Sequence, residues 1–285
     1  MPIKKRILMG FGVLVVAGIV WLLNGGSFGD GRPNVEDRLI GSAGLGDPVV
    51  PDLGNGGFDV QSYDLLIEWE KDNTIVGEAV IAAEATTDLT RFNLDLADLD
   101  VSAVTVDSVD ATYSQEDTEL QITPSRTITE GDEFSVFVSY SGKPTAAQDG
   151  IIESGWHVHD AGGFTLGEPR GASHWFPSND HPSDKATYTL QVKVPAGTHV
   201  ASNGTLQQTS DSGDGELIWE FADAGLMASY LTTVIIGNYE TLPAGSVDGI
   251  ELRNVFPLDA SPAEKQVFDN HDRMIEVLSL SLIHI

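Results

Sequence analysis

Short runs of alternating apolar and polar residues recur through the middle of the chain, starting at about Phe58. Such a run places its apolar side chains on one face of an extended strand and its polar side chains on the other. Gly, Asp, Asn and Pro residues, which favour turns, separate the runs. Many short strands joined by turns predict a mostly β protein, built as an antiparallel sandwich. The expected strands lie at residues 63–69, 74–85, 92–96, 101–109, 134–140, 188–194, 217–221 and 231–236.

Two turn sequences predict which strands pair. The Lys-Asp-Asn sequence at residues 71–73 separates two apolar-rich runs, which predicts a long hairpin over residues 63–85. Asn203 and Gly204 separate two further runs within residues 200–209. Asn-Gly is a favoured two-residue hairpin turn, so we expect a second hairpin at that point.

A helix is predicted only near the C-terminal end. The sequence Ser-Pro-Ala-Glu at residues 261–264 is a capping box with proline at the first helical position. Apolar residues then recur at helical spacing, so we expect one helix from about residue 262 to residue 278. Because it follows a long β region, this helix predicts that a truncated second domain begins over residues 246–285. We interpret the apolar, uncapped residues 279–285 as a truncation or a reading-frame artefact.

The N-terminal segment has the pattern of an export signal. Basic residues at 4–6 precede an uninterrupted apolar stretch at 7–23. This pattern predicts a signal peptide or signal anchor over residues 1–29, and a protein that is exported, membrane-anchored or extracellular. Residues 30–57 are rich in Gly, Pro, Asp and Asn, a composition typical of a flexible linker. The sandwich domain is then expected over residues 58–245.

Composition excludes several classes of function. The chain has 43 Asp and Glu residues against 15 Lys and Arg residues, an acidic balance that disfavours binding to nucleic acid. It has no cysteine, which excludes a disulfide framework and a cysteine nucleophile. Neither a phosphate-binding glycine loop nor a GxSxG elbow is present, and no histidine is followed by glutamate, so HExxH is absent.

The segment 163–187 lacks strand and helix periodicity and is rich in proline, histidine and charged residues, with one tryptophan. A loop of this kind carries function more often than a core position does. Trp175 and Phe176 are expected to anchor it in the sandwich core. The sequence that follows, with Asp180 in an Asx-type turn, favours a structural role as a locked turn.

Two candidate sites lie in and beside this loop. Glu168 precedes Pro169, so its backbone is restricted and its carboxylate could bind a cation, or it could be a solvated loop acid. His157 and His159 lie two residues apart, on one face of an extended strand. Such a pair can chelate zinc or copper, but with no third ligand at recognisable spacing the pattern favours an exposed loop.

The ordered motifs of this loop resemble a family. Residues 165–188 match the form T-Q-x-E-P-x-x-A-R-x-x-F-P-C-x-D-x-P-x-x-K-A-x-F of the N-terminal domain of the M1 zinc aminopeptidases, the aminopeptidase N-like metallopeptidases. Residues 58–65, 192–195, 201–204 and 228–231 also resemble that domain. The resemblance extends over residues 45–278.

The resemblance implies a saddle-like β-sandwich packed on a thermolysin-like α/β catalytic domain. It implies that Glu168 binds the free α-amine of peptide substrates, which restricts cleavage to the first residue. It also implies zinc, which activates water and polarises the scissile carbonyl. The family's GxMEN and HExxH motifs are missing, so the zinc ligands and catalytic residues would lie beyond residue 285. We therefore expect no catalytic or metal-binding residue here, and no peptidase activity from this chain alone.

The chain also departs from the family motif. Leu166 stands where glutamine is usual and Ser178 where cysteine is usual. Two alternatives to an aminopeptidase domain remain at this point. One is an M1-like scaffold without catalysis, and the other is an unrelated extracellular sandwich that binds carbohydrate or protein. The coding sequence downstream of residue 278 discriminates among them.

Overall fold

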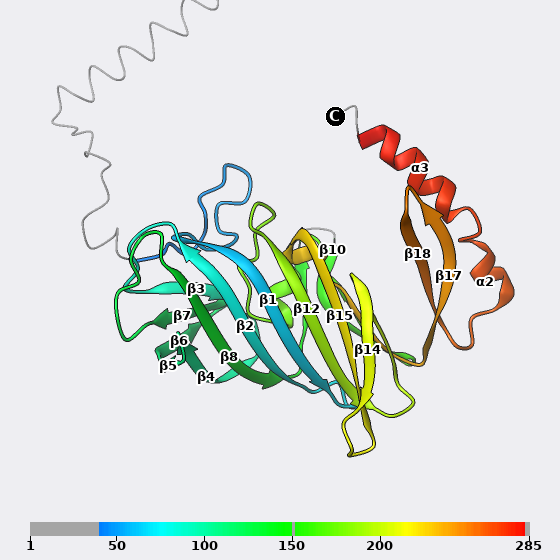
Figure 1. Ribbon diagram of the computed structural model, residues 1–285, viewed down its shortest axis with the longest axis horizontal. Coiled ribbons are helices and arrows are strands. Elements are labelled where there is room, and N and C mark those ends of the chain that lie inside the picture. Colours follow the sequence, from blue (N-terminus) through cyan, green and yellow to red (C-terminus); the bar gives the residue numbers. More distant parts are fainter. Residues whose placement is uncertain (1–39, 150–151, 283–285) are drawn as a thin grey trace, which may run out of the picture. The chain divides into compact units, whose positions relative to one another are not determined.

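The computed structural model describes residues 40–149 and 152–282, which belong to one compact unit, Arg38–Ile285 (Figure 1). Strands dominate this unit, which confirms the mostly β, antiparallel prediction. Across the described ranges, helices are too short or too polar to cross a membrane. The segment at residues 1–29, expected to be a signal or anchor, lies outside the described residues.

The largest sheet of the described chain has eight strands in the order β14-β15-β12-β1-β2-β8-β4-β5. Two of its inner strands, β1 and β12, run parallel with Ser62 opposite Thr187, while the other neighbours are antiparallel. The bounds are β14 Thr205–Asp211, β15 Glu216–Ala228, β12 Lys185–Pro195, β1 Phe58–Trp69, β2 Ile75–Ala85, β8 Glu133–Gly142, β4 Asp100–Val106 and β5 Val109–Asp110. The hairpin predicted over residues 63–85 is confirmed as β1 and β2.

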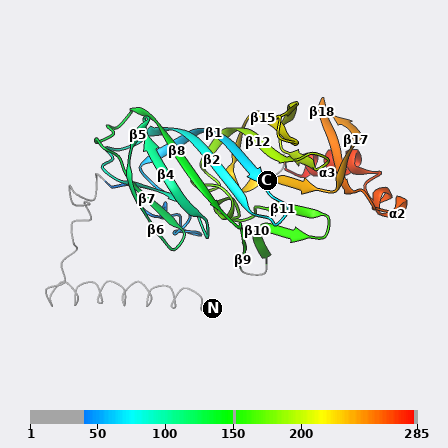
Figure 2. The same ribbon diagram turned by 90° about the horizontal axis from the view of Figure 1, so that it is seen from below.

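Two smaller sheets complete the sandwich. One contains β13 (His199–Ser202), β16 (Val234–Gly237), β11 (Gly162–Leu166), β10 (Ile152–His159) and β9 (Ala146–Asp149), in that order. The other contains β3 (Phe92–Asp95), β7 (Glu119–Thr123) and β6 (Thr112–Glu116). Figure 2 shows β9, β10 and β11 next to one another, beside the large sheet.

One apolar core joins the sheets. Along β1, β2, β8 and β12 the side chains alternate between buried and more exposed, as period-2 patterning requires. Their buried side chains pack in the same cluster as those of β3, β7 and β16. The largest fully buried members include Trp175, Tyr63, Tyr140, Phe92 and Phe176.

The second hairpin prediction is wrong. Asn203 and Gly204 do join β13 to β14, but these strands belong to different sheets and do not pair. Gly204 adopts the positive φ (69°) that such a turn favours. The Asn203 side chain, however, accepts a hydrogen bond from the Thr233 backbone N–H at 2.6 Å. This contact attaches the connection between the two sheets to the segment just before β16.

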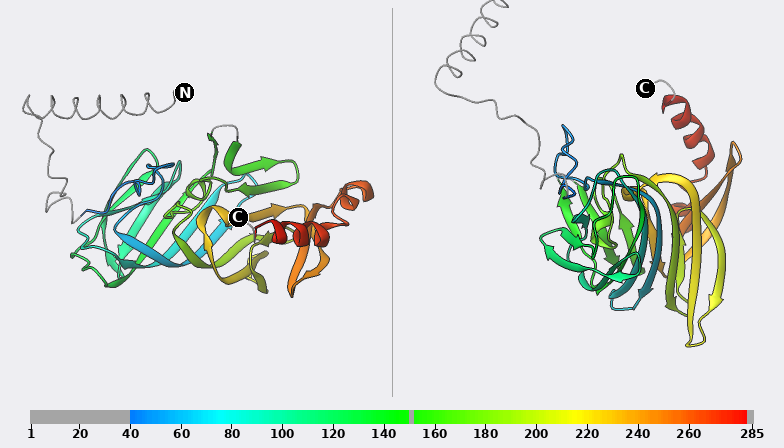
Figure 3. Two further views of the ribbon diagram at one scale, coloured as in Figure 1. Left: turned by 90° about the horizontal axis from the view of Figure 1, so that it is seen from above. Right: turned by 60° about the vertical axis from the view of Figure 1, so that its left-hand side comes forward.

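The C-terminal part of the described chain consists of a hairpin and two helices. β17 (Tyr239–Val247) and β18 (Ile250–Pro257) pair antiparallel, and this hairpin crosses the expected domain boundary at residue 246. Figure 3 shows the red helix α3 (His271–Leu282) beside the orange hairpin. The hairpin therefore carries the chain from the sandwich to the helices.

The predicted start of the helix at about residue 262 is confirmed. The prediction of one continuous helix to residue 278 is wrong, because the structure has two helices there. Helix α2 (Pro262–Gln266) begins with a complete capping box between Ser261 and Glu264. It ends after Gln266, and α3 starts five residues later. Asp and Asn at positions 269 and 270 favour turns and helix starts over helix interiors, which accounts for the break.

The described part of the expected linker, from residue 40 to residue 57, is attached to the sandwich. The backbone N–H of Gly41 donates to the Arg91 carbonyl at 2.8 Å, and Asn55 is fully buried. Gly and Asn residues in this segment therefore serve tight backbone contacts with the sandwich.

Candidate functional site

Glu168 lies two residues after the end of β11, in the loop that leads into the 3-10 helix η2 (Ala172–His174). Its side chain is exposed, and the Glu168–Pro169 peptide bond is cis. The residue lines a hollow of about 460 Å³ formed by β11, β16 and the segment before β16. The lining residues are Phe164, Thr165, Leu166, Gly167, Glu168, Tyr230, Leu231, Thr233 and Ile235. Glu168 is the one ionisable carboxylate among them.

The backbone on both sides of Glu168 is closely packed. A Cβ atom at Gly167 would overlap the carbonyl oxygen of Tyr230, so only glycine permits this approach. The N–H of Gly171 donates to the Gly167 carbonyl at 2.5 Å. A Cβ at Gly171 would lie 2.5 Å from the Leu166 carbonyl oxygen. These contacts fix the peptide that carries Glu168 without using its side chain.

The apolar anchors predicted for this loop are confirmed. Trp175 and Phe176 are both fully buried, and their rings meet edge to face at a centroid distance of 4.5 Å. Tyr63 of β1 packs against Phe176 in the same way, at 5.7 Å. The loop after Glu168 is therefore attached to the centre of the large sheet.

A buried polar network locks the chain that follows. The Asp180 carboxylate accepts hydrogen bonds from the Ser229 hydroxyl at 2.7 Å and from the Ser173 N–H at 3.3 Å. The N–H of Asp180 donates to the Asp95 carboxylate at 2.8 Å. The Asn179 side-chain amide donates to Asp184 at 2.5 Å. The prediction that this loop is locked is confirmed, but the Asx-type turn expected at Asp180 is wrong. The Asp180 carboxylate accepts from Ser229 and Ser173, and the residue two positions on, Pro182, has no N–H to donate.

Burial shifts the acids of this network toward their neutral forms. It raises the pKa of Asp180 to about 6, and hydrogen bonds from Ser229 and Ser173 partly oppose it. Burial, together with the negative charge of Asp59, raises the pKa of Asp184 to about 7. Burial also raises the pKa of Asp95 well above its usual range.

Asp95 and Asn55 were not expected in this network. The alternation of β3 predicted that its polar side chains face solvent, yet Asn93 and Asp95 are only 4% and 7% exposed. The Asn55 side chain donates to Asp95 at 3.0 Å. The partners of Asp95 are 40 and 85 positions away in the sequence, so no local pattern could have revealed them.

The histidine pair does not fit a zinc site. His157 and His159 both pack against Phe164, at ring distances of 5.3 and 5.5 Å. Nε2 of His159 is hydrogen-bonded to the Tyr239 hydroxyl, and Nδ1 accepts from the Ala161 N–H at 3.1 Å. In the part of the chain that the structure describes, no three His, Asp or Glu side chains gather to hold a metal ion. The zinc that the motif resemblance implies therefore has no centre among these residues.

The fold and site together define a class: a β-sandwich that presents one exposed carboxylate, on a fixed loop, beside a mostly apolar hollow. The Peptidase M1 N-terminal domain family model matches residues 60–231, more than half of the sequence. The chain belongs to this family. Membership excludes the alternative of an unrelated extracellular sandwich.

Two similar proteins are named as aminopeptidases. The chain is 22% identical over 231 residues to Probable aminopeptidase 1 of Saccharolobus solfataricus, covering 77% of this chain and 28% of that protein. It is 26% identical over 200 residues to Aminopeptidase N of Acetobacter pasteurianus, covering 67% of this chain and 56% of that protein. The chain thus spans between about a quarter and about half of these two relatives.

Solved structures confirm the fold. An M1 zinc metallopeptidase from Deinococcus radiodurans superposes with a TM-score of 0.71 at 29% identity, covering 77% of this chain and 52% of that chain. A two-domain M1 zinc metallopeptidase E323A mutant bound to L-arginine gives a TM-score of 0.74 at 30% identity, covering 83% of this chain and 56% of that chain. Full-length members of the family are thus zinc enzymes.

Proposed function

We propose that this chain is the domain of a zinc aminopeptidase that binds the substrate's N-terminus, and that a catalytic domain outside these 285 residues supplies the chemistry. The observation that carries the proposal is Glu168, an exposed carboxylate on a backbone fixed at Gly167 and Gly171. Because the backbone at Glu168 is already fixed, binding a cation has to order only its side chain, which lowers the entropic cost of binding.

The proposed ligand of Glu168 is the α-ammonium group of a peptide. A hydrogen bond between two ionised groups is shorter and stronger than one between neutral groups. Only the first residue of an unmodified peptide offers a charged amine at its backbone nitrogen. A site built on this contact therefore selects for removal of N-terminal residues over internal cleavage.

The hollow beside Glu168 is the proposed place for the first side chain of the peptide. Leu166 and Leu231 line it and remain 48% and 47% exposed, so apolar surface is available for contact. Burial of such surface contributes roughly 25 cal/mol per Å². Apolar first residues are therefore the proposed substrates.

Export or membrane anchoring is part of the proposal. It is supported by the basic residues at 4–6 followed by the apolar stretch at 7–23. The substrates would then be peptides outside the cytoplasm.

The test uses the longer protein that contains this chain. We expect zinc-dependent release of the first residue from a peptide with a free N-terminus, and loss of release when that N-terminus is acetylated. Glu168→Gln should lower kcat/KM by roughly tenfold to a hundredfold, the effect of losing a hydrogen bond to a charged group. Glu70→Gln, at an exposed turn position, is the matched control.

Equal cleavage of free and acetylated peptides would contradict the proposed role of Glu168. A folded, zinc-loaded protein that releases no residue from any peptide would favour the scaffold without catalysis.

A further inference from the structure

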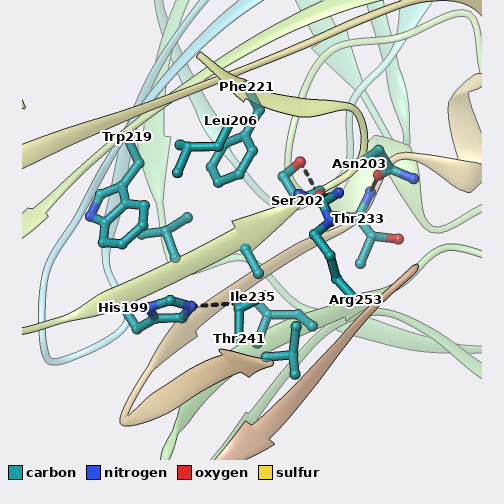
Figure 4. A pocket seen from close by; sticks show the side chains of 13 residues that line it. His199, Ser202, Asn203, Leu206, Trp219, Phe221, Thr233, Ile235, Thr241 and Arg253 are labelled. Carbon is teal, nitrogen blue, oxygen red and sulfur yellow. Dashed lines mark hydrogen bonds between the residues drawn. The ribbon is translucent and has the colours of Figure 1, made fainter. Parts of the chain in front are cut away.

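A second hollow of about 460 Å³ opens between the sandwich and the β17–β18 hairpin. Figure 4 shows its side chains, which come from β13, β14, β15 and β16 on one side and from the hairpin on the other. It shares Thr233 and Ile235 with the hollow beside Glu168, but Glu168 itself does not line it. Its size is within the range of about 300–1,000 Å³ that is usual for small-molecule sites.

Most of the lining is apolar. Trp219, Phe221 and Leu206 cover one wall in Figure 4, and Val200, Ile235 and Val255 also contribute. His199 closes one end, where its Nε2 pairs with the Thr241 hydroxyl at 2.8 Å. Its ring meets Trp219 edge to face at 5.0 Å, and burial lowers the pKa of His199. That end is therefore uncharged at neutral pH.

Arg253 supplies the one permanent charge of the lining. Its Nη2 donates to the carbonyl oxygens of Gly204 and Ser202, at 2.6 and 3.3 Å. Within the described residues, the Arg253 side chain donates both of these hydrogen bonds through Nη2. The N–H groups on Nε and Nη1 are therefore available to a ligand. The guanidinium group is thereby held in place with donors to spare.

The charge of this hollow is opposite to that of the protein. The sequence has 43 Asp and Glu residues against 15 Lys and Arg residues, yet no acid lines the hollow. An anion would be repelled by most of this surface, but here it meets an arginine among apolar side chains. Arginine is also the cation best matched to a carboxylate, because its planar donors fit two oxygens at once.

We propose that the hollow between the sandwich and the β17–β18 hairpin binds a small amphipathic carboxylate. Its aromatic or branched aliphatic body packs against Trp219 and Phe221, and its carboxylate pairs with Arg253. The ligand bridges the sandwich and the hairpin, since Arg253 belongs to β18 and the aromatic wall belongs to β15.

The experiment titrates the ¹⁵N-labelled chain of 285 residues with 4-phenylbutyrate and, in parallel, with the neutral 4-phenylbutyramide. We expect a saturable shift of the Trp219 indole N–H resonance, assigned with Trp219→Phe. The amide should bind roughly tenfold more weakly, because it lacks the charge that strengthens the contact with arginine. Arg253→Gln should abolish this preference, while Arg126→Gln, at an exposed arginine on another part of the sandwich, should retain it.

A second pair of variants keeps the test valid if Arg253→Gln fails to fold. Leu206 is 40% exposed on β14 at the wall of the hollow. Leu206→Glu should weaken carboxylate binding by roughly tenfold relative to Leu206→Gln, because the two variants differ mainly in one negative charge. Equal affinity for acid and amide, equal binding by these two variants, or no Trp219 shift up to about 10 mM ligand would each overturn the proposal.

Discussion

Asn55 and Asn179 exchange two hydrogen bonds across 124 positions of sequence. The Asn55 N–H donates to the Asn179 side-chain oxygen at 2.6 Å, and the Asn179 side-chain amide donates to the Asn55 carbonyl at 3.1 Å. The Asn179 side chain thus bonds both the backbone N–H and the backbone C=O of Asn55, as a neighbouring β-strand would. Both residues are at most 1% exposed, so water cannot replace these bonds.

We predict that Asn179→Ala destabilises the domain by about 2–4 kcal/mol, because it leaves the buried N–H and C=O of Asn55 without partners. Asn238→Ala, at an exposed position, should change the free energy of unfolding by less than about 0.5 kcal/mol. Urea denaturation of both variants measures the difference. Similar unfolding midpoints for the two variants would show that the hydrogen bonds between Asn55 and Asn179 contribute little to the stability of the domain.

The buried acids predict a stability that falls as pH rises. The folded-state pKa of Asp180 is raised to about 6 and that of Asp184 to about 7, above the ordinary value of 3.8. The folded state therefore holds these protons more tightly than the unfolded state does. Their contribution is complete below an ordinary aspartate pKa of about 4, and it is lost as pH rises through the folded values.

Between about pH 5 and pH 8 we expect the free energy of unfolding to decrease by about 2–4 kcal/mol. Asp184→Asn should reduce this dependence to the part that Asp180 contributes, since asparagine does not ionise, while Asp64→Asn at an exposed position of β1 should preserve it. Chemical denaturation at several pH values provides the measurement. A free energy of unfolding that rises between pH 5 and pH 8 would contradict the raised pKa values of Asp180 and Asp184.

Gly167→Ala should disturb the loop that carries Glu168. The added methyl group would overlap the Tyr230 carbonyl, and relieving that overlap requires backbone movement. We expect a loss of about 1–3 kcal/mol in stability, the usual cost of overpacking. Gly225→Ala, where the new atom meets only an Asp223 carboxylate oxygen at 3.2 Å, is the control. Equal melting temperatures would show that the loop accommodates a side chain.

Leu166→Gln should change which first residue the longer protein prefers. Replacing apolar lining by an amide should lower the ratio of kcat/KM for leucine over glutamine substrates by roughly tenfold, or about 1.4 kcal/mol. Leu226→Gln, 69% exposed on β15, should keep the ratio unchanged. An unchanged ratio in Leu166→Gln would show that this hollow does not hold the first side chain.

The chain of 285 residues should release no N-terminal residue from any peptide, with or without added zinc. Its sequence lacks HExxH, and its described residues offer no group of three potential metal ligands. A fluorogenic aminoacyl substrate, with an active aminopeptidase as positive control, measures this directly. Zinc-dependent turnover by the purified chain would contradict it.

The sequence predicted those elements whose structure is decided by residues close together in the chain. The alternation over β1 and β2 and the capping box at Ser261 were predictable because each signal lies within a few residues. The Asn-Gly turn was misassigned because pairing of β14 is decided by β15, not by the preceding strand. Asp95 was placed on the wrong face because its partners come from distant segments. The hollow beside Glu168 was hidden for the same reason, since it combines β11 with residues 230–235.

The parallel pairing of β1 with β12 bears on how the site is assembled during synthesis. Ser62 of β1 lies opposite Thr187 of β12. The strand β1 therefore pairs with a strand that is synthesised more than a hundred residues later. Closing so long a loop is entropically costly and slows folding relative to local hairpins. Glu168 lies inside that loop, 17 positions before Lys185, the first residue of β12. The β1–β2 hairpin can therefore form early, while the loop that carries Glu168 meets its packing partner Tyr230 only after β12 has been made.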